Sequence, residues 1–177
     1  ADCSWGAFAG CQGAVEPRQE VCGDGLDQDC NGSDLRRQDQ YEPNNECNSC
    51  TLLNNPGEDD VERTLRATID SAADTWDYYC FDAHDGFSVP GFSESIEATL
   101  SDIPNGADYD LFLYKTVQDC RDGNSLEFSI EGGNSVDSLQ WSEPVGSDDS
   151  GRYVIGVRRV FGQSCDLNYT LEVRGLN

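Results

Sequence analysis

Short runs of alternating apolar and polar residues, separated by turn-forming stretches, constrain the fold of this chain more than any other feature. The alternation is clearest in Ile96–Leu100, Leu111–Leu113, Tyr153–Val157 and Tyr169–Val173. Because side chains of a β-strand point alternately to the two faces of a sheet, a period of two predicts strands. We expect them at 63–69, 77–83, 94–103, 109–117, 136–145, 152–161 and 168–174, with a weaker one at 125–131.

This pattern predicts an all-β chain, and specifically an antiparallel β-sandwich of the jelly-roll type, because short strands and frequent turns favour two packed sheets. No window shows helical periodicity. Residues 1–38 differ, since they lack any period and carry four of the nine cysteines. Such a segment needs disulfides, a metal or a neighbour to become ordered. We therefore expect two units: an irregular, disulfide- and metal-stabilised module over 1–38 and a β-sandwich over 39–177.

Aromatic residues, Phe161 among them, alternate along several of these strands, and core packing is the default interpretation for them. The segment 111–114 is apolar on both faces, because Phe112 and Tyr114 alternate with two leucines. Either both faces are covered, or one is a contact surface; we favour coverage.

The charge balance excludes two classes of partner. The chain has 34 acidic and 11 basic side chains among Lys and Arg, which gives a formal net charge of −23. Nucleic-acid binding needs clustered cations, and so does docking on an anionic lipid surface. The longest apolar stretch lies around Tyr153–Val157, far short of a membrane span. We expect neither nucleic-acid binding nor membrane insertion.

Cysteine usage indicates the compartment. The chain has nine cysteines but one histidine and one Cys-x-x-Cys pair, so disulfides are favoured over zinc. Disulfides predict a secreted protein, extracellular or on a cell surface. An odd count leaves at least one thiol free or bonded to another chain. The pairings we expect are Cys22–Cys30, then Cys120–Cys165, a local Cys3–Cys11, and Cys80 with either Cys47 or Cys50, the other being the odd thiol.

One acidic loop has the spacing of a calcium ligand set. Asp27, Asp29 and Asn31 are followed by Gly32, which matches the opening of an EF-hand loop. Gln38 occupies the place of the bidentate glutamate, and no flanking helices are expected. We therefore predict a calcium loop of another kind, completed by Asp24 or Asp34. The alternative is a solvated acidic turn.

The string Glu20–Gly32 resembles the acidic, cysteine-containing repeats of secreted bacterial proteins, which are of the MopE type and similar to thrombospondin type 3 repeats. The resemblance implies metal binding by this module. The last aspartate of the repeat falls one residue early here, at Asp34.

A second resemblance covers about 40–176 and rests on five segments in order. They are Tyr41–Asn45, Asp74–Phe81, Ala107–Tyr114, Gly151–Val157 and Tyr169–Val173. Together they resemble the bacterial pre-peptidase C-terminal domain, a family related to the collagen-binding domains of clostridial collagenases. The resemblance implies a non-catalytic β-sandwich, an accessory module of secreted peptidases and other surface proteins.

This resemblance also implies a calcium site between the entry segment and the Asp-x-x-Asp before the second strand. The ligands would be Glu42, Asn44, Asn45, Asp74 and Asp77. Carboxylate and amide oxygens are the donors that calcium prefers. The alternative is that Glu42–Asn45 merely turns the chain. Asp108 and Asp110 are expected to shape a turn rather than bind an ion.

The sequence does not favour catalysis. His84, the sole histidine, lies in a polar stretch after a strand, and no Gly-x-Ser-x-Gly elbow occurs. We predict a secreted calcium-binding protein that acts in adhesion or assembly, for example as a fibre or sheath subunit. Its partner would be itself or an extracellular protein or polysaccharide matrix. One alternative is an accessory module of a secreted peptidase, and another is a hydrolase with an unrecognised carboxylate pair.

Overall fold

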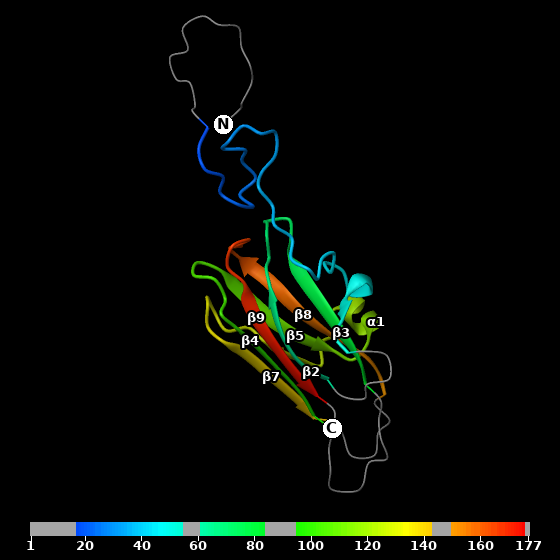
Figure 1. Ribbon diagram of the computed structural model, residues 1–177. Helices are drawn as coiled ribbons and strands as arrows, with labels where there is room; N and C mark the ends of the chain where they lie inside the picture. Colours follow the sequence, from blue (N-terminus) through cyan, green and yellow to red (C-terminus); the bar gives the residue numbers. More distant parts are fainter. Residues whose placement is uncertain (1–16, 55–60, 84–94, 143–149, 176–177) are drawn as a thin grey trace, which may run out of the picture.

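Two β-sheets packed face to face form the body of the molecule (Figure 1). The computed structural model describes residues 17–54, 61–83, 95–142 and 150–175. The five-stranded sheet has the order β1 (Thr51–Leu52), β3 (Trp76–Ala83), β8 (Gly151–Phe161), β5 (Asp108–Tyr114) and β6 (Glu127–Ser129). The four-stranded sheet has the order β2 (Val61–Ala67), β9 (Tyr169–Gly175), β4 (Ser95–Ser101) and β7 (Asp137–Ser142). All pairings are antiparallel except β1 with β3, so the predicted antiparallel β-sandwich is confirmed.

Of the nine strands in the described ranges, eight fall at the ranges that the alternation predicts. The exceptions to the sequence prediction are the two-residue β1, the 3-10 helix η1 (Cys47–Ser49) and the helix α1 (Val117–Asp122). The helix has six residues, too few to show a period. The residues at its two ends explain why the helix forms. The Thr116 side chain accepts a hydrogen bond from the Asp119 N–H, and Gly123 ends the helix in the left-handed conformation.

The core lies between the sheets and consists of the inward residues of each alternating strand. Tyr79, Tyr153 and Ile155 contribute from the five-stranded sheet and are fully buried. Leu100 and Leu171 contribute from the four-stranded sheet. Burial of one such side chain stabilises a fold by about 1.5–3 kcal/mol. The period of two therefore predicts the core as well as the strands.

The outer face of the five-stranded sheet carries a second apolar cluster. Tyr78, Cys80, Tyr114 and Val154 pack there against α1 and η1, which are joined by the disulfide Cys47–Cys120. A further disulfide, Cys50–Cys80, fastens the same region. The predicted covering of both faces at 111–114 thus holds at Tyr114, while Phe112 remains partly exposed. Phe161, expected in the core, is instead 51% exposed at the end of β8.

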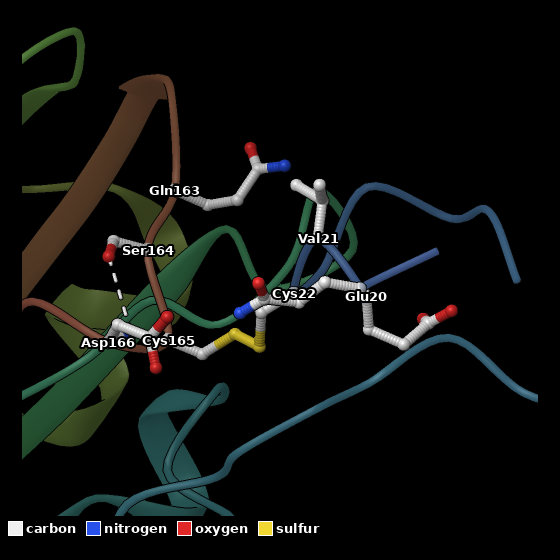
Figure 2. A pocket seen from close by; sticks show the side chains of 8 residues that line it. Glu20, Val21, Cys22, Gln163, Ser164, Cys165 and Asp166 are labelled. Atoms are coloured by element: carbon white, nitrogen blue, oxygen red, sulfur yellow. Dashed lines mark hydrogen bonds between the residues drawn. A yellow bond between two sulfur atoms is a disulfide. The ribbon is translucent and has the colours of Figure 1, made fainter. Parts of the chain in front are cut away.

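The cysteine pairings correct two predictions. Cys22 pairs with Cys165 rather than Cys30, across 143 residues (Figure 2). Cys120 pairs with Cys47 rather than Cys165. The reason is spatial, because the turn after β8 brings Cys165 beside residue 22, and η1 brings Cys47 beside α1.

The pairing Cys50–Cys80 is one of the two that we expected, but Cys47 is bonded and is not the odd thiol. Cys30 is also disulfide-bonded. The predicted pair Cys3–Cys11, and with it the odd cysteine, lies outside the described residues.

Residues 17–38 have no helix or strand and lie at one end of the sandwich, in blue in Figure 1. Besides the disulfide, Gln163 Nε2 donates to the Gly23 carbonyl at 3.0 Å. A Cβ at residue 23 would lie 1.9 Å from the Asp70 carbonyl oxygen, so only glycine permits this contact. The segment is therefore fastened to the two loops at 70–71 and 163–166.

The disulfides indicate an oxidising compartment, extracellular or periplasmic. Within the described ranges, none of the helices has the length and apolar character that a membrane crossing requires.

Candidate metal centre

Three carboxylates converge at the end of the sandwich where β3 begins. Glu42, Asp74 and Asp77 each offer a carboxylate oxygen, and these oxygens lie within 4.8 Å of one another. Asp77 is on β3 and faces inward with Tyr79, while Asp74 lies on the connection from β2 to β3. The Tyr78 N–H donates to the Asn44 carbonyl at 2.8 Å, which lays the entry segment with Glu42 along the start of β3.

Backbone contacts from β8 fix the loop that carries Asp74. The Arg159 N–H donates to the Thr75 carbonyl at 3.0 Å. Its guanidinium donates to the carbonyls of Asp74 at 3.1 Å and Ala72 at 2.8 Å. The connection between β2 and β3 is therefore held at three carbonyls, and the Asp74 carboxylate lies with those of Glu42 and Asp77, a cluster of three called the acidic pocket below.

The electrostatics of this pocket disfavour three negative charges without a cation. Burial, reinforced by the charge of Glu42, raises the pKa of Asp74 to about 7. Burial and the neighbouring Asp74 raise the pKa of Asp77 well above its usual range. Burial likewise raises the pKa of Glu42. Asp74 and Asp77 are 3% and 1% exposed, so water screens them little.

Several buried polar atoms in and around the pocket have no hydrogen-bond partner. They include both side-chain amide atoms of Asn44, which is 1% exposed, and Oδ1 of Asp77. Oδ2 of Asp70, which is 0% exposed, is another. Buried polar atoms are nearly always paired in folded proteins. The oxygens among these atoms are of the type that a hard cation binds, whereas Asn44 Nδ2 is a hydrogen-bond donor. Asn45 is exposed and donates its side-chain amide to Asp74 Oδ1.

The donor set fits a hard divalent cation. Three carboxylates and the amide oxygen of Asn44 offer only oxygen, and calcium takes six to eight oxygen ligands. Asn45 presents its amide nitrogen to Asp74, so its oxygen would reach an ion only after the amide turns over. The chain thus brings together all five residues of the second predicted ligand set. Sequence reasoning missed Asp39 and Asp70, whose charges also act on Glu42. Neither residue lies in a recognisable motif, although Asp70 lies four residues before Asp74 in the same loop.

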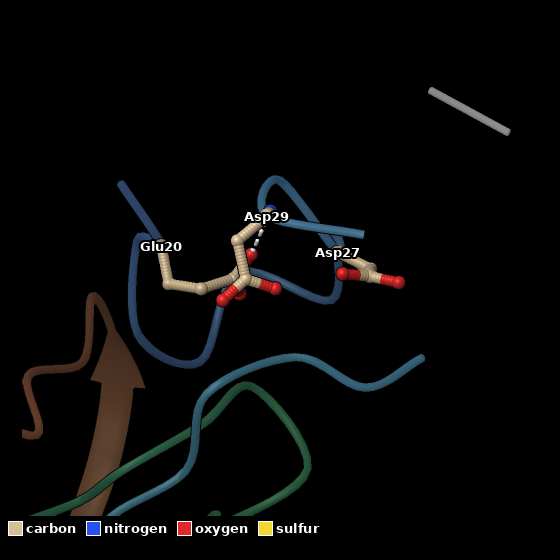
Figure 3. A group of neighbouring side chains, drawn as sticks. All are labelled: Glu20, Asp27 and Asp29. Carbon is tan, nitrogen blue, oxygen red and sulfur yellow. Dashed lines mark hydrogen bonds between the residues drawn. The ribbon is translucent and has the colours of Figure 1, made fainter. Parts of the chain in front are cut away.

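The predicted acidic loop gives a second, more open cluster. Glu20, Asp27 and Asp29 place carboxylate oxygens within 4.8 Å of one another. Figure 3 shows the three side chains of this cluster. The predicted ligand set of this loop does not include Glu20, although Glu20 is the first residue of the string that resembles the acidic repeat. All three side chains are partly exposed.

Carboxylates of this loop are engaged by its own backbone. Asp27 accepts the N–H groups of Asn31 and Gly32 at 3.0 and 2.9 Å. Glu20 accepts the N–H of Asp29 at 2.6 Å.

The remaining predicted ligands of this loop cap turns. Asp34 accepts the N–H groups of Gly23 and Gly25, and Asp24 accepts that of Leu26. The Asn31 side-chain oxygen accepts the Ser33 N–H. The structure therefore joins Asp27 and Asp29, and Asn31 donates its side-chain amide to Asp29 Oδ2 at 3.0 Å. Asp24 and Asp34 instead accept hydrogen bonds from turns.

Of the acidic pair on β5, Asp110 forms an ion pair with Arg158 on β8. Asp110 therefore lies within the strand and pairs across the sheet, whereas we expected it to shape the turn before the strand. His84, which we expect to be an exposed loop residue, lies outside the described residues.

Comparisons with known proteins give a distant likeness. No family model matches the chain, and no curated protein matches it. Among solved structures, the chain is similar to PliG from Aeromonas hydrophila, a periplasmic lysozyme inhibitor of g-type lysozyme. The identity is 12% and the TM-score 0.41, over 72% of this chain and 97% of that one. This likeness is too distant to carry an argument about function, and the resemblance to pre-peptidase C-terminal domains stays a prediction.

Proposed function

We propose that this protein is a calcium-binding, non-catalytic β-sandwich of the bacterial cell exterior that acts in adhesion or assembly. Its ion would be held by Glu42, Asp74 and Asp77, with amide oxygens from Asn44 and Asn45. The observation that carries this proposal is the convergence of three carboxylates next to buried polar atoms without partners. A divalent cation would neutralise the repulsion and would pair the oxygen atoms among them, Asp77 Oδ1 and Asn44 Oδ1, while Asn44 Nδ2 is a donor and needs an acceptor instead.

Burial also argues for a structural ion rather than a catalytic centre. A hydrolytic carboxylate pair must reach its substrate. Asp74 and Asp77 are 3% and 1% exposed, and the Asp77 carboxylate accepts a hydrogen bond from Tyr169 between the sheets. An ion here would join the entry segment, the loop before β3 and β3 itself. Calcium would therefore stabilise the fold and set the direction in which the chain enters it.

Calcium titration of the purified chain tests this proposal. Extracellular modules bind calcium with Kd values of about 10⁻⁴–10⁻³ M. Ten millimolar calcium should then add roughly 1.4–2.7 kcal/mol by mass action, a rise in Tm of about 3–10 °C. Asp77→Asn should remove most of this response. Asp122→Asn, which changes an exposed carboxylate on α1, serves as the control and should keep it.

A companion variant separates the two acidic clusters. Asp27→Asn alters the open loop and leaves Asp77 intact, so it should keep the main thermal response. Loss of the response in Asp27→Asn but not in Asp77→Asn would move the ion to the acidic loop. No thermal shift and no bound calcium in native mass spectrometry of the wild type would overturn the proposal.

The choice between assembly and an accessory role in a larger enzyme needs a second measurement. An assembling subunit should sediment as species above the 19.4 kDa of one chain in calcium. It should return to the monomer on chelation or reduction. A monomer in all conditions would favour the accessory module.

A further inference from the structure

A cation of the chain itself lies beside the acidic pocket. Arg36, in the segment 17–38, places a guanidinium nitrogen 2.7 Å from Asp70 Oδ1 and 3.0 Å from Ser71 Oγ. Asp70 is 0% exposed, and its N–H donates to Asp74 Oδ2 at 3.3 Å. Asp70 therefore contacts both Arg36 and Asp74, which is a proposed calcium ligand.

The charges of this region are strongly unbalanced. The charges of Asp39 and Asp70 act on Glu42, and those of Glu42 and Asp70 act on Asp74. Asp77 lies in the field of Asp74, Asp39 and Glu42. The charge of Arg36 acts on Asp70, Asp74 and Glu42 in turn. Arg159 also faces the region, but its guanidinium is occupied by the carbonyls of Asp74 and Ala72. Arg36 thus pairs directly with a carboxylate of this region, that of Asp70.

We propose that Arg36 is a built-in counter-cation of this pocket, and that it weakens calcium binding at Glu42, Asp74 and Asp77. This inference rests on the proposed function. Without metal, Arg36 compensates the buried charge of Asp70, whose isolation would be costly. When a divalent cation binds, the two positive charges repel each other. By thermodynamic reciprocity, the ion then weakens the contact between Arg36 and Asp70 to the same degree.

The two effects of removing this charge have opposite signs, which makes the inference testable. Arg36→Gln should lower the Tm in chelator by about 3–8 °C, because Asp70 loses its partner. The same variant should bind calcium about three- to tenfold more tightly, because a nearby positive charge is gone. If Arg36 had only a structural role, its removal would lower both the Tm and the calcium affinity.

The chain offers a matched control in the next residue. Arg37 pairs with Asp166 at 2.7 Å, but both side chains are well exposed, at 61% and 66%. Arg37→Gln should therefore leave calcium affinity within about twofold of the wild type and change the Tm little. Arg36→Lys keeps the charge and should return calcium affinity to near the wild-type value.

The experiment is isothermal titration of calcium into the full chain, with thermal unfolding in chelator and in calcium. If Arg36→Gln is unfolded in chelator, the dependence of its Tm on calcium concentration gives the affinity. Equal or weaker calcium binding by Arg36→Gln, while the wild type binds, would overturn the role of Arg36 alone. No calcium binding by the wild type would overturn the proposed function, and with it this inference.

Discussion

The hydroxyl of Tyr169 on β9 donates a hydrogen bond to Asp77 Oδ2 on β3 at 2.5 Å, and so connects the two sheets at the acidic pocket. The same hydroxyl lies 2.7 Å from that of Tyr79. Both rings are fully buried. Asp77 is therefore oriented from the core side, and its other carboxylate oxygen is left for the pocket.

Tyr169→Phe should weaken calcium binding by about tenfold, because outer hydrogen bonds that orient a metal ligand typically have this effect. It should also lower the free energy of unfolding by about 1–3 kcal/mol, since buried polar atoms lose a partner. Calorimetric titration and denaturant unfolding measure the two effects.

Tyr109→Phe is the matched control. The Tyr109 ring packs edge-on against Tyr169, with centroids 5.9 Å apart, but its hydroxyl is buried without a hydrogen-bond partner. Its removal should cost little in stability or calcium affinity. Equal losses in the two variants would contradict an orienting role for Tyr169.

Removing Cys47–Cys120 should destabilise the sandwich by about 2–4 kcal/mol, because the bond holds α1 and η1 over the outer apolar cluster. The double variant Cys47→Ser with Cys120→Ser is compared with the wild type in urea, and Tyr78 and Tyr114 should become more accessible to solvent.

The double variant Cys22→Ser with Cys165→Ser should behave differently. It frees the segment 17–38 at its strongest attachment while the sheets stay intact. We expect rapid proteolysis within that segment and a smaller loss of stability. Proteolysis as slow as in the wild type would show that the remaining contacts are sufficient.

Stability should fall at alkaline pH through the tyrosines. Burial raises the pKa of Tyr78, Tyr79, Tyr109, Tyr114 and Tyr169 in the folded chain. The unfolded chain ionises near pH 10 while the folded chain does not, so stability is present below that pH and lost above it. Ultraviolet absorbance of tyrosinate should appear together with unfolding. Full ionisation of a still folded chain near pH 10 would contradict this.

Gly156 on β8 should not tolerate a side chain. A Cβ there would lie 3.0 Å from carbons of both Trp76 and Tyr78, whose rings stack at 5.1 Å between centroids. Gly156→Ala should cost about 1–3 kcal/mol and shift the tryptophan fluorescence. Gly132→Ala, with nothing within 4 Å of the added carbon, is the control and should be nearly neutral.

Local sequence pattern was sufficient for most of the fold, because strand and core both follow from a period of two. It was insufficient for α1, which depends on its capping residues Thr116 and Gly123 rather than on a period. Phe161 illustrates another limit: it lies at the end of β8, beyond the covered part of the sheet.

The candidate site, too, is predictable from the sequence only in part. Glu42, Asp74 and Asp77 lie in recognisable segments, and the resemblance to pre-peptidase C-terminal domains predicts that their side chains converge. Arg36 and Asp70 are 34 residues apart, and no local pattern links an arginine of an irregular segment to a buried loop carboxylate. Likewise, nine cysteines allow many pairings, and Cys22 pairs with the distant Cys165 rather than with Cys30, its predicted partner nearby in the sequence.

The bond between Cys22 and Cys165 also determines how the molecule would carry mechanical load. Tension applied between residue 17 and residue 175 would pass through the disulfide and bypass the 143-residue separation that it bridges. Only residues 17–22 and the short stretch from Cys165 through β9 would remain in the path of the force. Since β9 is hydrogen-bonded to β2 on one side and β4 on the other, the pulled strand is the one that the four-stranded sheet clamps along both edges.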